Sequence, residues 1–229
     1  MGRQDNIEIF EDTQRLYKSN ERLISAIKHS IAEQESFTGT GRYWYGPGHQ
    51  IYQRPAKVIV NPKRTLEAAA PYAYAGKKVC VLNFASATNP GGGVVKGSSA
   101  QEEAICRCST LYPNLKEQYI WNTFYAPHRR IRNPLHNDDC IYTPGVVVFK
   151  SDTDYPQLLP EDKWYSINVL TCAAPNLRER PSTEMNSGDG DAAVHISREE
   201  LQALHEKRMR RVLEIAWAKG NEVVILGAF

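Results

Sequence analysis

The segment KKVCVLNFASATNPGGGVVKGSSAQEE, residues 77–103, places a strand, a glycine-rich loop and the start of a helix in direct succession. KKVCVLNF is a continuous apolar run with charge only at its entry, which is typical of a strand buried on both faces. Gly91–Gly93 follow it, and Gln-Glu-Glu at 101–103 opens a helix. Because ligands of such sheets bind beyond the carboxyl ends of the strands, this loop is a candidate ligand site.

The rest of the chain alternates between predicted helices and strands. Helices are predicted over residues 19–34, 65–75 and 101–112, and strands over 56–60, 77–84, 138–150, 164–176 and 221–229, with a kink or bulge at Pro144-Gly145. Residues 178–192 are rich in Gly, Ser and charge and predict a surface insertion. This alternation predicts an α/β fold, with a mixed or parallel sheet and helices on both faces.

A long helix is predicted to begin just after the insertion. Ser197-Arg198-Glu199-Glu200 fits a capping box. The apolar residues that follow extend the helix to Trp217 and are expected to form its packing face: Leu201, Leu204, Met209, Val212, Leu213, Ala216 and Trp217.

The composition is that of a globular protein, with 41% hydrophobic and 24% charged residues among 229. The net charge of +2, from 28 Lys and Arg against 26 Asp and Glu, gives no strong nucleic-acid signal. No stretch is apolar enough for a signal peptide or a membrane span. Scattered cysteines without zinc spacing indicate a reduced, cytoplasmic protein, and we expect no metal and no cofactor: Cys80, Cys106, Cys108, Cys140 and Cys172.

The glycine loop has two interpretations. Gly91–Gly93 lack Cβ atoms, so the backbone can take positive φ angles and approach a ligand closely. Free N–H groups there and at the following helix N-terminus form a site for phosphate. A tight strand-to-helix turn explains three glycines equally well, and the loop alone leaves both interpretations open.

The two acids behind the loop also have a structural interpretation. Ser99-x-x-Glu102 fits a capping box, in which Glu102 bonds back to the Ser99 backbone, and Ser98-x-x-Gln101 fits one register earlier. Glu103 lies about 100° around the helix from Glu102 and is not explained by capping. Acids in a first turn also complement the helix dipole, so the residues alone do not decide between dipole and catalysis for Glu103.

Two further segments favour structural over functional interpretations. Tyr43, Trp44 and Tyr45 are expected to pack beneath a loop rather than stack on a ligand. A basic stretch is expected to be a solvated charged loop rather than a contact for a polyanion: His128, Arg129, Arg130, Arg132 and His136.

The order Asn-Pro, Gly-Gly-Gly, seven residues and Gln-Glu-Glu, after a buried strand, resembles the signature of poly(ADP-ribose) glycohydrolases of the bacterial type. The resemblance extends to VNPKRTLEAA, IYTPGVVVFK and VLTCAAPN, and to HEKRMRRVLEIAWAKG and EVVILGAF near the end. It therefore covers nearly all of the chain. It implies a macrodomain-like three-layer α/β/α fold with a mixed central sheet. Residues 1–229 would form one domain, with a helical and loop extension at 1–60 and the core at 61–229.

The resemblance also implies hydrolysis of the ribose–ribose O-glycosidic bond of poly(ADP-ribose) carried on modified proteins, with release of ADP-ribose and without a metal. Glu103 would be the catalytic acid and base, and Glu102 would hold the ribose hydroxyls. The closeness of the two acids is expected to raise the apparent pKa of one of them. The remaining residues implied to contact substrate are Phe84, Ala85, Ser86, Asn89, Gly91, Gly92, Gly93, Val94, Gln101, Gly227, Ala228 and Phe229.

This sequence departs from the family pattern in two places. The family's last strand runs into a second glycine-rich loop and a further helix, whereas this sequence stops at Gly227-Ala228-Phe229. The expectation is either a C-terminally truncated chain or a partner chain that completes the fold. Asn83 stands where relatives often have Asp, which leaves an adenine contact there open.

Two other functions are compatible with the residues. One is a macrodomain-like module that binds ADP-ribose without cleaving it, which would need the glycine loop but not two adjacent acids. The other is a hydrolase of a different ADP-ribosyl linkage, on protein or nucleic acid.

Overall fold

The central sheet has the strand order β1-β3-β4-β2-β5 in the computed structural model, which describes residues 2–39, 54–179 and 194–227. β2 runs parallel to both β4 and β5, whereas β3 is antiparallel to β1 and β4. The carboxyl ends of β2 and β4 therefore meet at one edge. The strands are β1 (Glu35–Phe37), β2 (Val79–Ala85), β3 (Cys140–Val148), β4 (Tyr165–Ala173) and β5 (Val223–Ile225).

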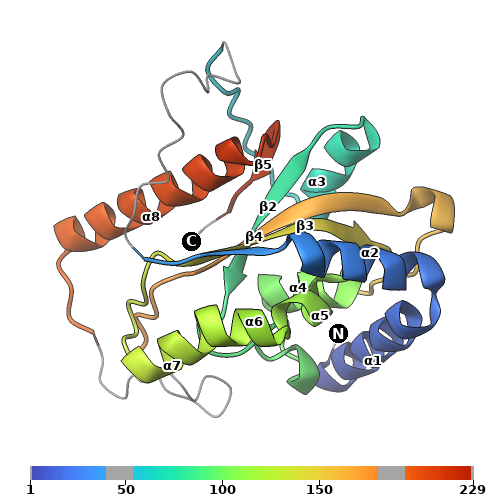
Figure 1. Cartoon of the computed structure of the whole chain (residues 1–229), viewed down its shortest axis with the longest axis horizontal. Coiled ribbons are helices and arrows are strands. Elements are labelled where there is room, and N and C mark those ends of the chain that lie inside the picture. The colour runs from blue at the N-terminus through green and yellow to red at the C-terminus, as the bar shows by residue number, and fades with distance from the viewer. Residues whose placement is uncertain (1, 40–53, 180–193, 228–229) are drawn as a thin grey trace.

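Both faces of the sheet carry helices, as the alternation along β2 requires. Val79 and Val81 pack in a cluster with α3 (Thr65–Tyr74), α4 (Gln101–Cys108) and α5 (Leu111–Leu115). Cys80 and Leu82 point to the opposite face and pack with α8 (Arg198–Ala218). Figure 1 shows α8 on one side of the sheet and α4 and α5 on the other. The predicted three-layer α/β/α arrangement with a mixed sheet is confirmed.

Two N-terminal helices pack beside this core. α1 (Arg3–Ser19) lies against α4 and the 3₁₀ turn η1 (Val94–Lys96), and α2 (Glu21–Glu33) lies against β3. A third apolar cluster joins Tyr17 and Leu23 of these helices to Phe149 and Trp164. The remaining short helices are α6 (Gln118–Ile120), the π-helical η2 (Trp121–Tyr125), α7 (Ala126–Ile131) and the 3₁₀ turn η3 (Glu161–Lys163).

Several local predictions are confirmed. β2 and β4 are buried strands, and α2 and α3 form within the predicted ranges. Ser197 caps α8 through a capping box with Glu200, and α8 extends one residue beyond the predicted end at Trp217. The pairing of β3 with β4 slips between Thr143 and Val146, which is the predicted bulge at Pro144-Gly145. The bulge changes which side chains face each helix layer.

Other predictions are wrong. Residues 56–60 form no strand in the structure, and Val58 is 84% exposed, because no described strand lies beside them. Helix 101–112 ends at Cys108, since Ser109 pairs with Val148 in an isolated bridge. β5 is half-buried rather than buried because it lies at the sheet edge. The buried face of α8 includes polar residues and excludes Leu213: Arg208, Arg211, Val212, Ile215 and Ala216.

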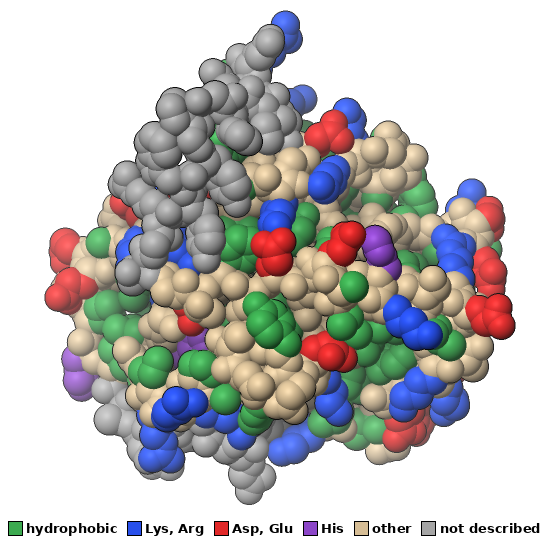
Figure 2. Space-filling model, in the orientation of Figure 1, with side chains coloured by type: hydrophobic (Ala, Val, Ile, Leu, Met, Phe, Trp, Pro, Cys, Tyr) green, Lys and Arg blue, Asp and Glu red, His purple; other side chains and the backbone are tan. Residues whose placement is uncertain are grey.

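The remaining predictions concern residues outside the described ranges or the protein surface. Tyr43, Trp44 and Tyr45 and most of 178–192 lie outside the described residues. On the face shown in Figure 2, positive and negative side chains are interspersed rather than gathered in one patch. Among the helices that the structure describes, none is both long and apolar enough to cross a membrane.

Candidate active site

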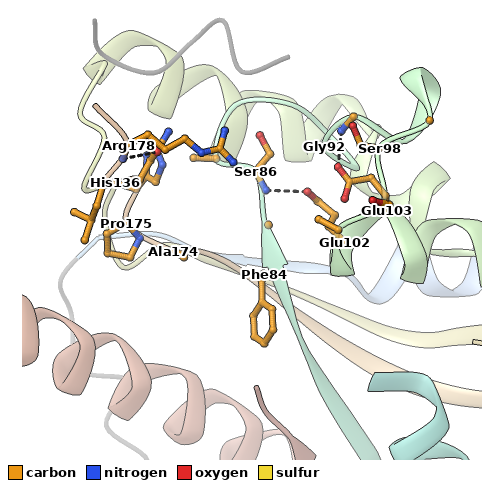
Figure 3. Close-up of a pocket in the computed structure, with 18 of the residues that line it drawn as sticks. Phe84, Ser86, Gly92, Ser98, Glu102, Glu103, His136, Ala174, Pro175 and Arg178 are labelled. Atoms are coloured by element: carbon orange, nitrogen blue, oxygen red, sulfur yellow. Dashed lines mark hydrogen bonds between the residues drawn. The ribbon is translucent and has the colours of Figure 1, made fainter. Parts of the chain in front are cut away.

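A cavity of about 770 Å³ lies beyond the carboxyl ends of β2 and β4. Phe84, Ala85 and Ser86 bring the end of β2 into it, and Glu102 and Glu103 enter it from the first turn of α4. Figure 3 shows the two carboxyl groups on one side of Ser86, with His136 and Arg178 on the other side. The site is therefore an elongated hollow with both acids towards one end.

Gln101 fixes the start of α4 to the end of β2. Its side-chain oxygen accepts the Phe84 N–H at 2.9 Å, and its amide nitrogen donates to the Leu82 carbonyl at 2.7 Å and to Thr65 Oγ1 at 3.1 Å. One amide thus satisfies strand-end backbone groups that would otherwise be left unpaired beside the cavity. The capping-box interpretation is wrong, because α4 is capped by Ala100 without a side-chain hydrogen bond.

Glu102 uses both carboxyl oxygens inside the protein. Oε2 accepts the Ser86 N–H at 2.8 Å, and Oε1 accepts Nδ2 of Asn83 at 3.4 Å. The side chain is only 3% exposed. Burial raises the pKa of Glu102 to about 8, against the opposing bond from Ser86, and the neighbouring Glu103 adds to the rise. The expected elevated pKa within the acid pair therefore falls on Glu102.

Glu103 is held by one oxygen only. Its Oε1 accepts the Gly93 N–H at 2.8 Å, whereas Oε2 is buried and has no hydrogen-bond partner among the described residues. An unpaired buried carboxyl oxygen is costly in free energy, and such exceptions concentrate at functional sites. Glu103 is thus a lining residue of the cavity with one carboxyl oxygen that no described group uses.

The close approach of the loop to both acids requires glycine at position 92. Gly92 has a φ of +58°, and a Cβ atom there would lie 2.5 Å from Oε1 of Glu103 and 2.9 Å from Oε2 of Glu102. The two carboxyl groups therefore converge on this residue. At Gly91, where φ is +69°, a Cβ would instead meet the ring of Tyr112 at 2.6 Å. These contacts explain two of the three consecutive glycines by space as well as by φ.

Arg208 supports the opposite wall of the cavity. This side chain of α8 is 1% exposed and donates to Asp138 Oδ1 at 3.1 Å, to the Ala173 carbonyl at 2.8 Å and to the Leu135 carbonyl at 3.0 Å. It thereby joins the end of β4 to the segment that carries His136. Burial lowers the pKa of His136 to about 3, with His128 and Arg208 adding to the fall, so its ring is neutral at physiological pH.

Asn83 has an internal role beside Glu102. It is fully buried, and its Nδ2 donates to Thr171 Oγ1 as well as to Glu102. Its Oδ1 is buried and has no hydrogen-bond partner among the described residues. Within the described residues, no group of three or more His, Cys, Asp or Glu side chains is arranged to hold a metal ion.

Residues 4–151 match the family model described as the catalytic domain of microbial-type PARG, where PARG stands for poly(ADP-ribose) glycohydrolase. The chain belongs to the microbial-type poly(ADP-ribose) glycohydrolase family. No protein with a curated description matches it.

Solved poly(ADP-ribose) glycohydrolase structures are similar over most of the chain. The enzyme from Thermomonospora curvata is 28% identical, with a TM-score of 0.76 over 98% of this chain and 80% of that one. The same enzyme bound to the inhibitor ADP-HPD gives a TM-score of 0.74 over 96% and 77% of the two chains at 28% identity. The enzyme from Deinococcus radiodurans in complex with ADP-ribose is 32% identical, with a TM-score of 0.60 over 74% and 61%.

The structure brings together only some of the residues to which the poly(ADP-ribose) glycohydrolase resemblance gives a role. Those that line the cavity are Phe84, Ala85, Ser86, Gly92, Gly93, Glu102 and Glu103. Asn89, Gly91, Val94, Gln101 and Gly227 are not among its lining residues. The Val94 side chain is fully buried in the core, and a Cβ atom on Gly227 would lie 2.7 Å from the Phe84 ring. Ala228 and Phe229 lie outside the described residues.

Sequence reasoning missed the N-terminal wall of this glycohydrolase cavity and much of its far wall. Arg3 and Asn6 of α1 line it beside Ser98, and the segment 174–178 lines it after β4. For the segment 174–178, the signal in the sequence was the predicted strand 164–176. A strand parallel to β2 ends at the same edge of the sheet as β2, where ligands bind. α1 gave little signal, since its buried positions include polar residues: Asn6, Phe10, Thr13 and Tyr17.

The basic segment is exposed to solvent as predicted at Arg130 and Arg132, but not at His128 and Arg129. Its first residues form the end of α7, where His128 is 3% exposed and Arg129 is half-buried, rather than a solvated loop. The sequence could not show that the two arginines at 129 and 130 have different surroundings, one facing the protein and one facing solvent.

Proposed function

We propose that this chain hydrolyses the ribose–ribose O-glycosidic bond of poly(ADP-ribose) carried on modified proteins and releases ADP-ribose. Glu103 acts as the single general acid and base, and Glu102 positions the substrate and the loop. The observation that carries the proposal is the difference in hydrogen bonding between the two acids. Glu102 has both oxygens bonded within the protein, whereas Glu103 has one buried oxygen without a partner among the described residues.

The reaction needs one transferable proton and one water molecule. Protonated Glu103 donates its proton to the bridging oxygen as the bond from the anomeric carbon to that oxygen breaks, and the electron pair leaves with the oxygen. The anomeric carbon becomes oxocarbenium-like, and the substrate's own diphosphate helps to stabilise it. A water molecule then attacks this carbon and loses a proton to the Glu103 carboxylate, which restores the acid.

The acid pair supplies that proton at neutral pH. Burial raises the pKa of Glu102 to about 8, so the pair retains a proton near pH 7. The convergence of both groups on Gly92 makes the proton available to Glu103.

The second carboxyl of a usual glycosidase has no counterpart here. Glycosidases ordinarily place two carboxyl groups across the scissile bond, about 5 Å apart or more. Glu102 and Glu103 both enter from the first turn of α4 and converge on Gly92, so they meet a sugar from one side. This arrangement supports a mechanism with one acid–base residue.

We assign direct substrate contact to those predicted site residues that line the cavity, and a structural role around the cavity to those that do not. Phe84, Ala85, Ser86, Gly92 and Gly93 would meet ADP-ribose. Asn89, Gly91, Val94 and Gln101 would shape the loop, and Gly227 would lie on the Phe84 side. We further infer that residues 1–229 act as one domain with an extension at 1–60. Five free, buried cysteines favour a reduced, cytoplasmic setting.

Release of ADP-ribose from three substrates tests the function: poly(ADP-ribose), mono-ADP-ribosylated protein and ADP-ribosylated nucleic acid. Release from the polymer alone supports the proposal. Binding of ADP-ribose without release from any substrate would identify a binding module instead. Release from a mono-ADP-ribosylated substrate but not from polymer would identify a different linkage.

A further inference from the structure

The side chains of Glu102, Glu103 and Arg129 hold the segment 86–93, called the glycine loop below, to the rest of the protein. Two attachments are the acids themselves: Ser86 N–H donates to Glu102, and Gly93 N–H donates to Glu103. Between them, the third attachment comes from Arg129 of α7. It is the only one of the three made by a side chain outside α4.

Arg129 binds the middle of the glycine loop through two different nitrogens. Its Nε donates to the Thr88 carbonyl at 2.7 Å, and its Nη2 donates to Oδ1 of Asn89 at 2.6 Å. The guanidinium carbon also lies 4.9 Å from the ring centroid of Trp121, one π-helical segment earlier in the chain. Stacking on an aromatic face and two hydrogen bonds together fix the plane of the guanidinium group.

Two backbone N–H groups of the glycine loop link Asn89 to the proposed acid. The Asn89 carbonyl accepts the Gly92 N–H at 2.9 Å, and the next N–H, that of Gly93, donates to Oε1 of Glu103. Arg129 and the proposed acid are therefore connected by hydrogen bonds at the two ends of one short turn of backbone, residues 88–93. The turn passes so close to the acids that a Cβ atom on Gly92 would collide with both.

We propose that Arg129 is a positioning residue for the glycine loop, which sets the place of Gly92 and Gly93 and so the fit of the substrate. This inference rests on the proposed function for its effect on catalysis, but not for its effect on the loop. Lysine cannot replace arginine fully, because a single ammonium group cannot make both bonds in one plane and stack on Trp121.

The test compares Arg129→Lys and Arg129→Ala with Arg130→Ala. Arg130 is the next residue on α7 and is exposed, so Arg130→Ala removes the same charge without touching the loop. Amide hydrogen exchange of Gly92 and Gly93 is measured by NMR in the absence of substrate. Steady-state hydrolysis of poly(ADP-ribose) then separates KM from kcat, and calorimetry gives Tm.

In Arg129→Ala, we expect the Gly92 and Gly93 amides to exchange about tenfold faster and KM to rise about tenfold, with kcat changing less. Arg129→Lys should show an intermediate effect and Arg130→Ala none. A general structural role would lower Tm without a selective change at these amides, and that outcome overturns the proposal, as does unchanged exchange. If wild-type protein neither binds ADP-ribose nor cleaves polymer, the proposed function fails, while the amide exchange still decides the role of Arg129.

Discussion

The backbone N–H of Gly93 donates to Oε1 of Glu103 at 2.8 Å, so the glycine loop and the proposed acid are joined directly. This bond orients the carboxyl group without using Oε2. In the proposed mechanism, the loop is thus part of the catalytic apparatus as well as a surface for substrate.

Glu103→Gln should abolish hydrolysis and preserve binding. The amide oxygen can still accept the Gly93 N–H, but the side chain cannot donate and recover a proton, so the rate should fall at least about 10²–10⁴-fold. ADP-ribose affinity should stay within a few-fold, as measured by calorimetric titration. Glu11→Gln, at an exposed carboxylate of α1, is the control. Near wild-type hydrolysis by Glu103→Gln, combined with none by Glu102→Gln, would reverse the assigned roles.

Gly92→Ala should inactivate the protein by contact rather than by backbone strain alone. The added Cβ atom would lie 2.5 Å from Oε1 of Glu103, and displacement of the acid should cost about 10²-fold in rate. Gly76→Ala is the matched control, because Gly76 has a φ of +74° and nothing within 4 Å of its Cβ position. Its strain should cost about 1–2 kcal/mol of stability and leave hydrolysis unchanged. Equal rates in the two variants would show that the contact with the acids is unimportant.

Stability should fall as pH rises from about 5 to 8, and Glu102 should cause part of that fall. Its pKa is about 8 in the folded protein and 4.5 when unperturbed, so between these values the folded state holds a proton that the unfolded state has lost. The contribution is present in full below pH 4.5 and is lost as pH approaches 8, by at most about 1.4 kcal/mol per pH unit. Urea denaturation at several pH values should give a flatter profile for Glu102→Gln than for wild type. Parallel profiles would mean that Glu102 is ionised across this range.

Arg208→Ala should destabilise the fold and weaken binding. It removes three hydrogen bonds from a 1% exposed side chain and leaves Asp138 with Lys207 alone, which should cost about 3–5 kcal/mol. ADP-ribose affinity should fall too, because the segments after β4 and around His136 lose their common support. Arg210→Ala, at an exposed position of the same helix, should stay within about 0.5 kcal/mol. A Tm equal to that of Arg210→Ala would contradict the support assigned to Arg208.

The elements that sequence predicted well are those with strong local signals. β2 reads as an apolar run because both of its faces are covered, and the Ser197 cap is made within four residues. α1 escaped prediction because its buried face includes Asn6, which donates to the Gly97 carbonyl 91 residues away. Residues 56–60 show the opposite error: their composition suits a strand, but strand formation needs a neighbour that local sequence does not reveal.

In the candidate site too, local features could be predicted from the sequence and long-range contacts could not. The glycines and the acid pair were recognisable because their motif is local. The resemblance predicts Gln101 near the substrate, whereas both polar atoms of its side chain make hydrogen bonds to Thr65, Leu82 and Phe84. Arg129 meets its loop partners 40 and 41 residues away, a pairing that folding creates and sequence spacing does not encode.

The tether between Gly93 and Glu103 also determines how a polymer complex should be captured for structural work. Truncation of Glu103 to alanine would free the loop amide and open a hollow, so the trapped geometry would differ from the reactive one. Glutamine keeps an acceptor for the Gly93 N–H and the volume of the side chain. Crystals grown with Glu103→Gln and a short ADP-ribose oligomer should therefore preserve the intact linkage in its native setting.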